Sequence, residues 1–234
     1  MTTTLWEYPS QHYDGPKSGP VQGSARYTGA TPSWVIWQVM QMHSRPGQRV
    51  IDPMCGSGTT LDVAKDLGRA ARGFDLVPSR DDVEQADARD LPVDDSSTDL
   101  VFIDPPYSTH IDYSDDPDCI GKLDALGPDG GAAYFDAMGA VLAEGGRVLR
   151  PGGALAIYVS DTWRPTKGEH RGGFSPIGLE LYAIARSLGF SPIDHVAVVR
   201  KNRKLSRGNF HKAADEHGFL LRGFNHLLLL RSRD

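Results

Sequence analysis

The sequence predicts an α/β fold with a mostly parallel, doubly wound sheet and an antiparallel hairpin near its C-terminal end. Short apolar segments alternate with segments of helical periodicity between residues 49 and 188. Two later apolar segments, 195–200 and 226–230, have no predicted helix between them, which favours an antiparallel pair. A length of 234 residues suits one domain. We therefore expect an irregular arm over residues 1–30 and a single domain over 31–234.

Turn-forming residues, prolines and glycines predict where the individual helices and strands begin and end. A helix is expected to begin after Pro32 and to end before the turn signal at Arg45-Pro46-Gly47. Strands are predicted at 49–52, 70–75, 99–104 and 154–160, with one more before Ala86. Helices are predicted at 58–67, 134–149 and 179–188, the first closed by Gly68 and the last by Gly189. In such sheets, ligands bind beyond the carboxyl ends of the strands, so the residues that follow each strand are the candidates for function.

Composition and charge narrow the setting. The content of 39% hydrophobic and 24% charged residues is typical of a soluble domain, with no apolar run near the ~20 residues of a membrane span. The first residues do not form a secretory signal, and only two cysteines are present, which favours the reducing cytoplasm. The net charge is −5, yet residues 200–234 hold nine Lys or Arg and three Asp or Glu, and such a basic stripe can bind phosphates.

The first motif, Asp52-Pro-Met-Cys-Gly-Ser-Gly-Thr-Thr60, stands where a strand becomes a helix. Gly56 and Gly58 permit a sharp turn and a close approach to a ligand, and the helix start offers unpaired N–H groups. The Lys that follows the second glycine in phosphate-binding loops is absent here. The third glycine of dinucleotide-binding loops is absent as well. The loop suits a ligand whose methionine end carries an ammonium and a sulfonium. Asp75, nineteen residues after Gly56, is placed to accept ribose hydroxyls, and Asp87 to accept an adenine amino group.

The second motif, Asp104-Pro105-Pro106-Tyr107, ends a buried strand. Two prolines fix the backbone, so the Asp104 carboxylate and the Pro105 carbonyl present two rigid acceptors. An exocyclic amino group has two hydrogens to donate to them. Accepting both draws the nitrogen lone pair out of conjugation, ready to attack a sulfonium methyl. Tyr107 is expected to stack on the base, which has to be flipped out of a duplex.

Together these motifs resemble the amino-methyltransferases that use S-adenosylmethionine and methylate adenine N6 or cytosine N4 in DNA. The resemblance covers residues 26–232 and implies the Rossmann-like class I methyltransferase fold, with seven strands and a reversed last strand. It implies that Asp104, Pro105, Pro106 and Tyr107 are catalytic. It also implies cofactor contacts from Thr31, Pro32, Asp52, Pro53, Cys55, Gly56, Ser57, Gly58, Thr59, Asp75, Leu76, Asp87, Ala88 and Asp104.

Three loops are expected at the same edge as the active site: an acidic lid at 108–130, and two basic loops at 162–175 and 201–222. Candidate nucleic-acid contacts in the basic loops are Arg164, Lys201, Arg203, Lys204 and Arg207. Only 34 residues follow Arg200, so sequence preference is expected to come from loops rather than from a large recognition domain. The expected partner is therefore nucleic acid, taken to be DNA; no membrane is involved, and the sequence does not indicate the oligomeric state.

Several alternatives stay open or are disfavoured. Asp before Pro-Pro-Tyr favours adenine N6, with cytosine N4 and an RNA amino group such as guanine N2 as alternatives. An alternative function of another class is a non-catalytic nucleic-acid-binding module that kept the fold. A dinucleotide-dependent oxidoreductase lacks its third glycine. Methylation of cytosine at carbon 5 needs an attacking thiolate, and the surroundings of Cys55 and Cys119 do not favour one. No metal site is expected, since the His and Cys spacing fits none.

Overall fold

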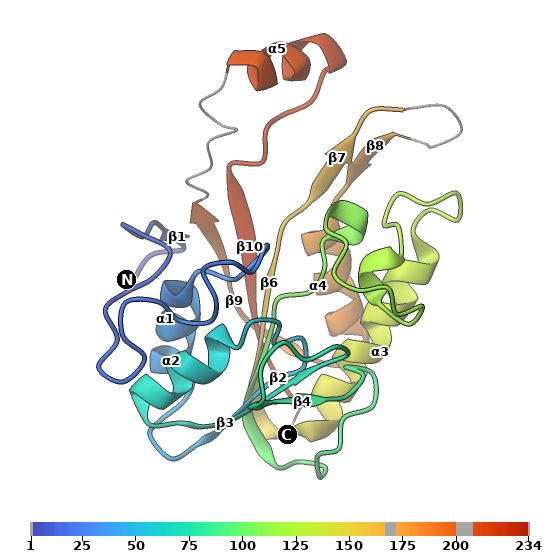
Figure 1. Cartoon of the computed structure of the whole chain (residues 1–234). Coiled ribbons are helices and arrows are strands. Elements are labelled where there is room, and N and C mark those ends of the chain that lie inside the picture. The colour runs from blue at the N-terminus through green and yellow to red at the C-terminus, as the bar shows by residue number, and fades with distance from the viewer. Residues whose placement is uncertain (1, 167–171, 200–207, 234) are drawn as a thin grey trace.

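The computed structural model describes residues 2–166, 172–199 and 208–233. Its main sheet has eight strands in the order β1-β9-β10-β6-β5-β2-β3-β4. Strand β10 is antiparallel to both of its neighbours, and every other pair is parallel. The predicted C-terminal hairpin is therefore confirmed, inside a mostly parallel sheet (Figure 1).

The strands of this sheet are β1 (Leu5–Trp6), β2 (Arg49–Asp52), β3 (Ala70–Asp75), β4 (Val83–Gln85), β5 (Thr98–Ile103), β6 (Leu149–Val159), β9 (Ser191–Val199) and β10 (Phe224–Arg231). The helices are α1 (Ser33–His43), α2 (Thr59–Leu67), α3 (Ala132–Val148), α4 (Ile177–Ser187) and α5 (Gly208–His217). A separate hairpin pairs β7 (Thr162–Arg164) with β8 (Gly173–Ser175), and short 3-10 turns cover Ser108–His110 and Ile120–Lys122.

Two helical layers cover the sheet, as in a doubly wound fold. Helices α1 and α2 pack on one face against alternate side chains of the central strands, including Leu100 and Phe102. Helices α3 and α4 pack on the other face, where Val101 and Ile103 point (Figure 1). Because every residue of β5 is buried, this central strand places the residue that follows it, Asp104, on a rigid base.

Most predicted elements match the structure closely. The strands over 49–52 and 70–75 have the predicted bounds, and α2 begins one residue after the predicted start because Gly58 adopts a left-handed cap. Helix α3 tolerates its glycines for a packing reason. A Cβ at Gly145 would already touch Val101, and one at Gly146 would lie 3.2 Å from the Phe190 ring.

Three elements differ from the prediction. Within the arm, Leu5–Trp6 forms an eighth strand on β9, and Trp6 is fully buried. The predicted connection between the last two strands contains helix α5, and the predicted basic loop at 162–175 begins and ends as the β7–β8 hairpin. In the described parts of the chain, no helix combines the length and apolar character that a bilayer crossing requires.

Candidate active site

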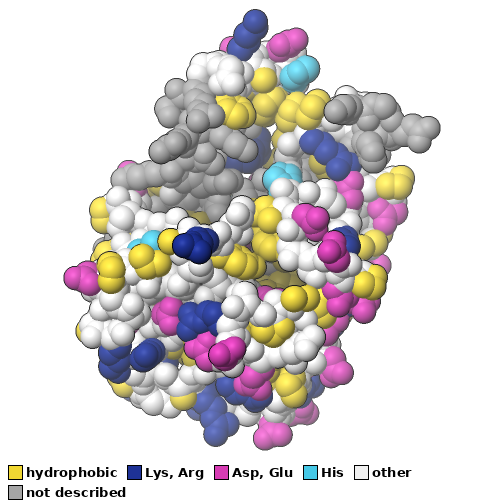
Figure 2. Space-filling view, in the orientation of Figure 1, with side chains coloured by type: hydrophobic (Ala, Val, Ile, Leu, Met, Phe, Trp, Pro, Cys, Tyr) yellow, Lys and Arg dark blue, Asp and Glu magenta, His cyan; other side chains and the backbone are white. Residues whose placement is uncertain are grey.

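A cavity of about 370 Å³ opens at the carboxyl ends of β2, β3 and β5. Figure 2 shows the molecule hollowed on this face, with hydrophobic side chains around the opening. Predicted site residues that line it are Thr31, Asp52, Pro53, Cys55, Gly56, Ser57, Thr59, Asp75, Leu76, Asp87, Ala88, Asp104 and Pro106. Four other predicted site residues are not among the lining residues: Pro32, Gly58, Pro105 and Tyr107.

The glycine loop turns as its composition predicts. Gly56 has φ +50° and Gly58 has φ +79°, a region that favours glycine. A Cβ at Gly56 would lie 2.8 Å from the Tyr27 hydroxyl, so only a glycine lets this ring sit on the loop. On the other side, Arg80 donates to the carbonyls of Ser57 and Gly58. The loop is therefore held from both sides.

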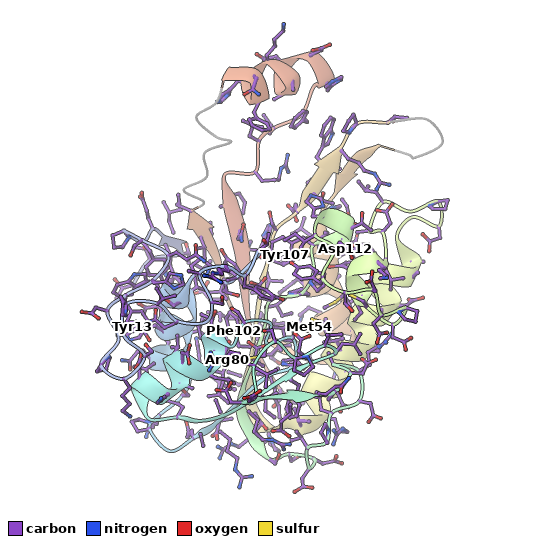
Figure 3. All side chains as sticks on the ribbon, viewed as in Figure 1. Tyr13, Met54, Arg80, Phe102, Tyr107 and Asp112 are labelled. Carbon is purple, nitrogen blue, oxygen red and sulfur yellow. The ribbon has the colours of Figure 1, made fainter. Side chains whose placement is uncertain are left out.

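Arg80 also ties the loop to its surroundings. It pairs with Asp62 at 3.0 Å and with Asp82 at 2.6 Å. Asp62 accepts in turn from the backbone of Gly23 in the arm, at 2.7 Å. The arm, the loop and the start of α2 are thus one connected unit, and Figure 3 labels Arg80 among the side chains of this region.

Asp75 and Asp87 enter the cavity with part of their hydrogen-bonding capacity already used. Asp75 accepts from the backbone N–H groups of Gly56 at 2.9 Å and of Val77 at 3.0 Å. Asp87 pairs with Arg89, whose guanidinium lowers the pKa of that carboxyl. Because a carboxylate offers about four lone-pair sites, Asp75 keeps capacity for a ligand. Both oxygens of Asp87 accept from Arg89, through its backbone N–H and its guanidinium, so a ligand there would compete with Arg89.

Asp52 lies buried at the floor of the loop. It accepts hydrogen bonds from the Thr60 hydroxyl and from the Met54 backbone at 3.1 Å. Burial nevertheless raises the pKa of Asp52 to about 7, because the charged form is poorly solvated there. A cation bound in the cavity would favour its ionised form.

The Asp104 carboxylate is fixed by Thr31 of the arm and by Tyr107 of its own motif, and Tyr107 is held in turn by Asn225. The Thr31 hydroxyl donates to one oxygen, and the Tyr107 hydroxyl donates to the other at 2.8 Å. Asn225 of β10 donates to the Tyr107 oxygen at 3.4 Å. Tyr107 therefore orients Asp104 in this structure, a role that the sequence alone did not predict for it.

The proline turn itself is braced from behind. The Pro106 carbonyl accepts from the Ser108 backbone at 3.0 Å and from the buried Tyr134 hydroxyl at 2.7 Å. Ser108 adopts φ +63°, a conformation that few non-glycine residues take. The backbone direction after Asp104 is thus set by α3 as well as by the prolines.

Two tyrosines that the motifs did not indicate complete the cavity. Tyr27 comes from the arm and Tyr113 from the acidic 108–130 loop, with ring centroids 6.5 Å apart. Tyr113 also meets the arm at Gly29, where a Cβ would lie 2.9 Å from its hydroxyl. Burial, with the nearby carboxylates as a lesser cause, raises the pKa of Tyr27 to about 12. Both phenols therefore stay neutral, and the predicted lid contacts the arm across the cavity.

Charge distinguishes this cavity from a phosphate site. Among the described residues that line it are five carboxylates and no Lys, Arg or His. An acidic cavity attracts a cationic ligand and repels a pyrophosphate. Cys55 lies in the lining, but burial raises the pKa of its thiol well above the usual value, so it is poorly suited to nucleophilic attack.

The predicted nucleic-acid contacts are placed only in part. The Arg164 guanidinium pairs with Asp124 of the acidic loop at 2.5 Å and donates to the Leu126 carbonyl at 3.1 Å. It therefore joins the β7–β8 hairpin to that loop. The other four candidates, Lys201, Arg203, Lys204 and Arg207, lie outside the described residues.

Comparison with known families identifies the first third of the chain. The model of the family N6_N4_Mtase, DNA methylase, matches residues 1–82. The match confirms the predicted family resemblance. It includes the glycine loop and Asp75 and ends before Asp104. No curated protein matches the sequence.

Solved structures show the same fold at low identity. The 4+2 cyclase SpnF is 17% identical, with a TM-score of 0.54 over 91% of this chain and 86% of that one. The 1,6-didemethyltoxoflavin-N1-methyltransferase of Burkholderia thailandensis, solved with S-adenosylhomocysteine, is 19% identical, with a TM-score of 0.52 over 89% and 80%. The predicted class I methyltransferase fold is therefore confirmed, and it hosts more than one reaction.

A third structure is a candidate DNA modification methylase from Thermus thermophilus, solved with S-adenosyl-L-methionine. It is 22% identical, with a TM-score of 0.46 over 64% of this chain and 52% of that one. The present chain thus spans about half the length of that protein.

Proposed function

We propose that the protein transfers a methyl group from S-adenosyl-L-methionine to an exocyclic amino nitrogen of a nucleobase in DNA, with adenine N6 as the preferred target. The observation that carries this proposal is the acidic cavity that opens directly onto Asp104. The family match over residues 1–82 adds support, because it is to a DNA methylase family.

The lining suits this cofactor chemically. Asp75 would hold the ribose, Asp87 and Ala88 would face the adenine, and the loop from Asp52 to Thr59 would hold the methionine end. The carboxylates complement an ammonium and a sulfonium, and the rings of Tyr27 and Tyr113 shield them from water. When bound, the cofactor supplies a methyl group on sulfur, and the bonding electron pair remains on the sulfur after transfer.

Asp104 acts on the acceptor. Thr31 and Tyr107 each donate to one oxygen of its carboxylate and so fix its orientation at the cavity. A carboxylate in this place would accept a hydrogen from the amino group of the base. Accepting that hydrogen shifts the nitrogen lone pair away from the ring and toward the methyl group. After transfer the nitrogen carries a surplus proton, which Asp104 is positioned to accept and pass to solvent.

The test is incubation of the purified protein with methyl-labelled cofactor and, separately, duplex DNA, single-stranded DNA and total RNA, followed by nucleoside analysis. We expect labelled N6-methyladenine in DNA, reduced roughly a hundred- to ten-thousand-fold in Asp104→Ala. The matched control Asp112→Ala, at an exposed acid of the 108–130 loop, should retain activity.

Other labels would change the proposal in defined ways. N4-methylcytosine would keep the chemistry and change the base. Label found only in RNA, for example on guanine N2, would keep the chemistry and change the proposed substrate from DNA to RNA. No label on any substrate, with calorimetry showing that the cofactor binds, would favour a non-catalytic nucleic-acid-binding module.

A further inference from the structure

Two projections extend beyond the sheet edge that carries Asp104. One is the β7–β8 hairpin, and the other is α5 with the chain that returns from it to β10 (Figure 1). Helix α5 buries only Ala214 among its residues, so the core does not account for it. Figure 2 shows hydrophobic side chains gathered on the side of this projection that faces β7–β8.

Aromatic rings join the two projections. Trp163 of β7 stacks on Phe219, with centroids 3.7 Å apart and an angle of 12° between the rings. His217 lies 6.1 Å from the same indole. Neither Trp163 nor Phe219 is fully buried, so part of this ring surface stays open to solvent.

More exposed apolar surface surrounds the stack. Phe174 of β8 is 50% exposed and carries the Arg222 guanidinium over its ring at 4.9 Å. Leu220 is 80% exposed and Phe224 is 43% exposed. We call Trp163, Phe174, Phe219 and Arg222, together with Leu220 next to Phe219, the ring platform. Stacked rings with a cation over one face are the surface chemistry that binds unpaired bases.

The ring platform is joined to the 108–130 loop by contacts on both sides of Trp163. Thr162, next to Trp163, hydrogen-bonds His110 at 2.9 Å, in the 3-10 turn directly after Tyr107. Arg164, on the other side, pairs with Asp124 of the same loop. The same loop lines the cavity through Tyr113, so the ring platform is tied to a border of the proposed active site.

Ring exposure distinguishes a single strand from a duplex as the occupant. In the described part of the α5 projection, Lys212 and Arg222 are balanced by Asp215 and Glu216, and the basic segment 200–207 before it lies outside the described residues. The bases of a duplex are stacked on one another, and only unpaired bases leave a face open to an aromatic ring. The exposed rings therefore favour unpaired bases.

We propose that the ring platform binds single-stranded DNA by stacking the bases next to the target base. The inference rests on the proposed function for its choice of DNA, and it adds that the substrate is unpaired around the target. A protein of this kind needs no separate energy for opening a duplex, since the bases reach the rings already unstacked.

The experiment measures binding without methyl transfer. Fluorescence anisotropy with a labelled oligonucleotide of roughly sixteen nucleotides covers a typical single-strand site. We expect Trp163→Ala and Phe219→Ala each to raise the Kd for single-stranded DNA by roughly tenfold, as loss of one stacked base implies. Trp163→Phe, which keeps a ring, should stay within about threefold. Leu188→Ala, an exposed apolar residue at the far end of α4, is the matched control and should change nothing.

Two results would overturn the inference: tighter binding of the matching duplex, or equal Kd values for wild type and both alanine variants. Equal effects on single-stranded RNA would support stacking on the rings and overturn the choice of DNA, because every base offers a face to stack. Ring variants that abolish a dimer in sedimentation without changing DNA affinity would assign the surface to a second copy instead. Failure of the proposed function looks different: single strands bind through the rings, yet no methyl label is transferred.

Discussion

The cofactor cavity and the ring platform hold their functional groups by different means. Around the glycine loop, side chains such as Asp75 and Arg80 bond to backbone atoms, and Asp52 is buried. On the ring platform, side chains meet mainly one another, and Phe174 and Leu220 are at least half exposed. The cavity is therefore built for one fixed geometry, whereas the platform offers surface to a variable sequence of bases.

This difference predicts where substitutions act. In the cavity, a change should alter backbone geometry, stability and cofactor affinity together. On the platform, a change should alter nucleic-acid affinity alone.

The largest expected effect concerns Asp52. Its folded-state pKa of about 7 lies above the unfolded value of about 3.9, so between these values the folded state retains a proton that the unfolded state has lost. The free energy of unfolding should fall on the order of 3 kcal/mol as pH rises from about 4 to about 7, and no further above. Asp52→Asn should remove that slope in urea unfolding series at several pH values. Equal slopes in the two proteins would mean that Asp52 is already ionised in the folded state.

Gly56→Ala should give the next largest effect. The new methyl would lie 2.8 Å from the Tyr27 hydroxyl and would displace the ring from the loop. Cofactor affinity by calorimetry should fall roughly tenfold or more. Gly47→Ala is the control, because it has a similar φ of +82° and nothing within 4 Å of a Cβ. Affinity that falls equally in both variants would point to a general loss of stability rather than to the ring.

The smallest expected effect is on the platform. Leu220→Ser should change the free energy of unfolding by less than about 0.5 kcal/mol, because the side chain is already in solvent. Leu228→Ala, buried in β10, should cost about 2–5 kcal/mol in the same urea measurement. A large fall in the free energy of unfolding of Leu220→Ser would show that the α5 projection is part of the core. The contrast between the two regions would then not hold.

Sequence reasoning succeeded where the signal is local. The strand over 49–52 is bounded by a turn and a glycine loop, and the helix after it ends at Gly68 in the left-handed conformation. Periodicity and punctuation suffice for such elements. The cavity lining followed from the same motifs, because strand ends in a parallel sheet meet at one edge.

It failed where function depends on distant contacts. Tyr27 and Tyr113 belong to irregular segments, and only the folded chain brings them over the loop. The clamp on Asp104 combines Thr31, Tyr107 and Asn225, from three separate regions. Strand β1 has only two residues, too few for any periodicity to be visible.

Strand β1 also affects the order in which the molecule can assemble. Leu5 and Trp6 pair with Ala197 and Val198, across nearly the whole described sequence. A contact of such high sequence separation forms late, after the loop it closes has been ordered. The Tyr27 part of the arm is held separately, through Gly23 and Asp62, so only the first residues of the arm wait for β9. The beginning of the chain is therefore among the last parts to reach its final place, and nascent chains that stop before β9 should leave Trp6 exposed.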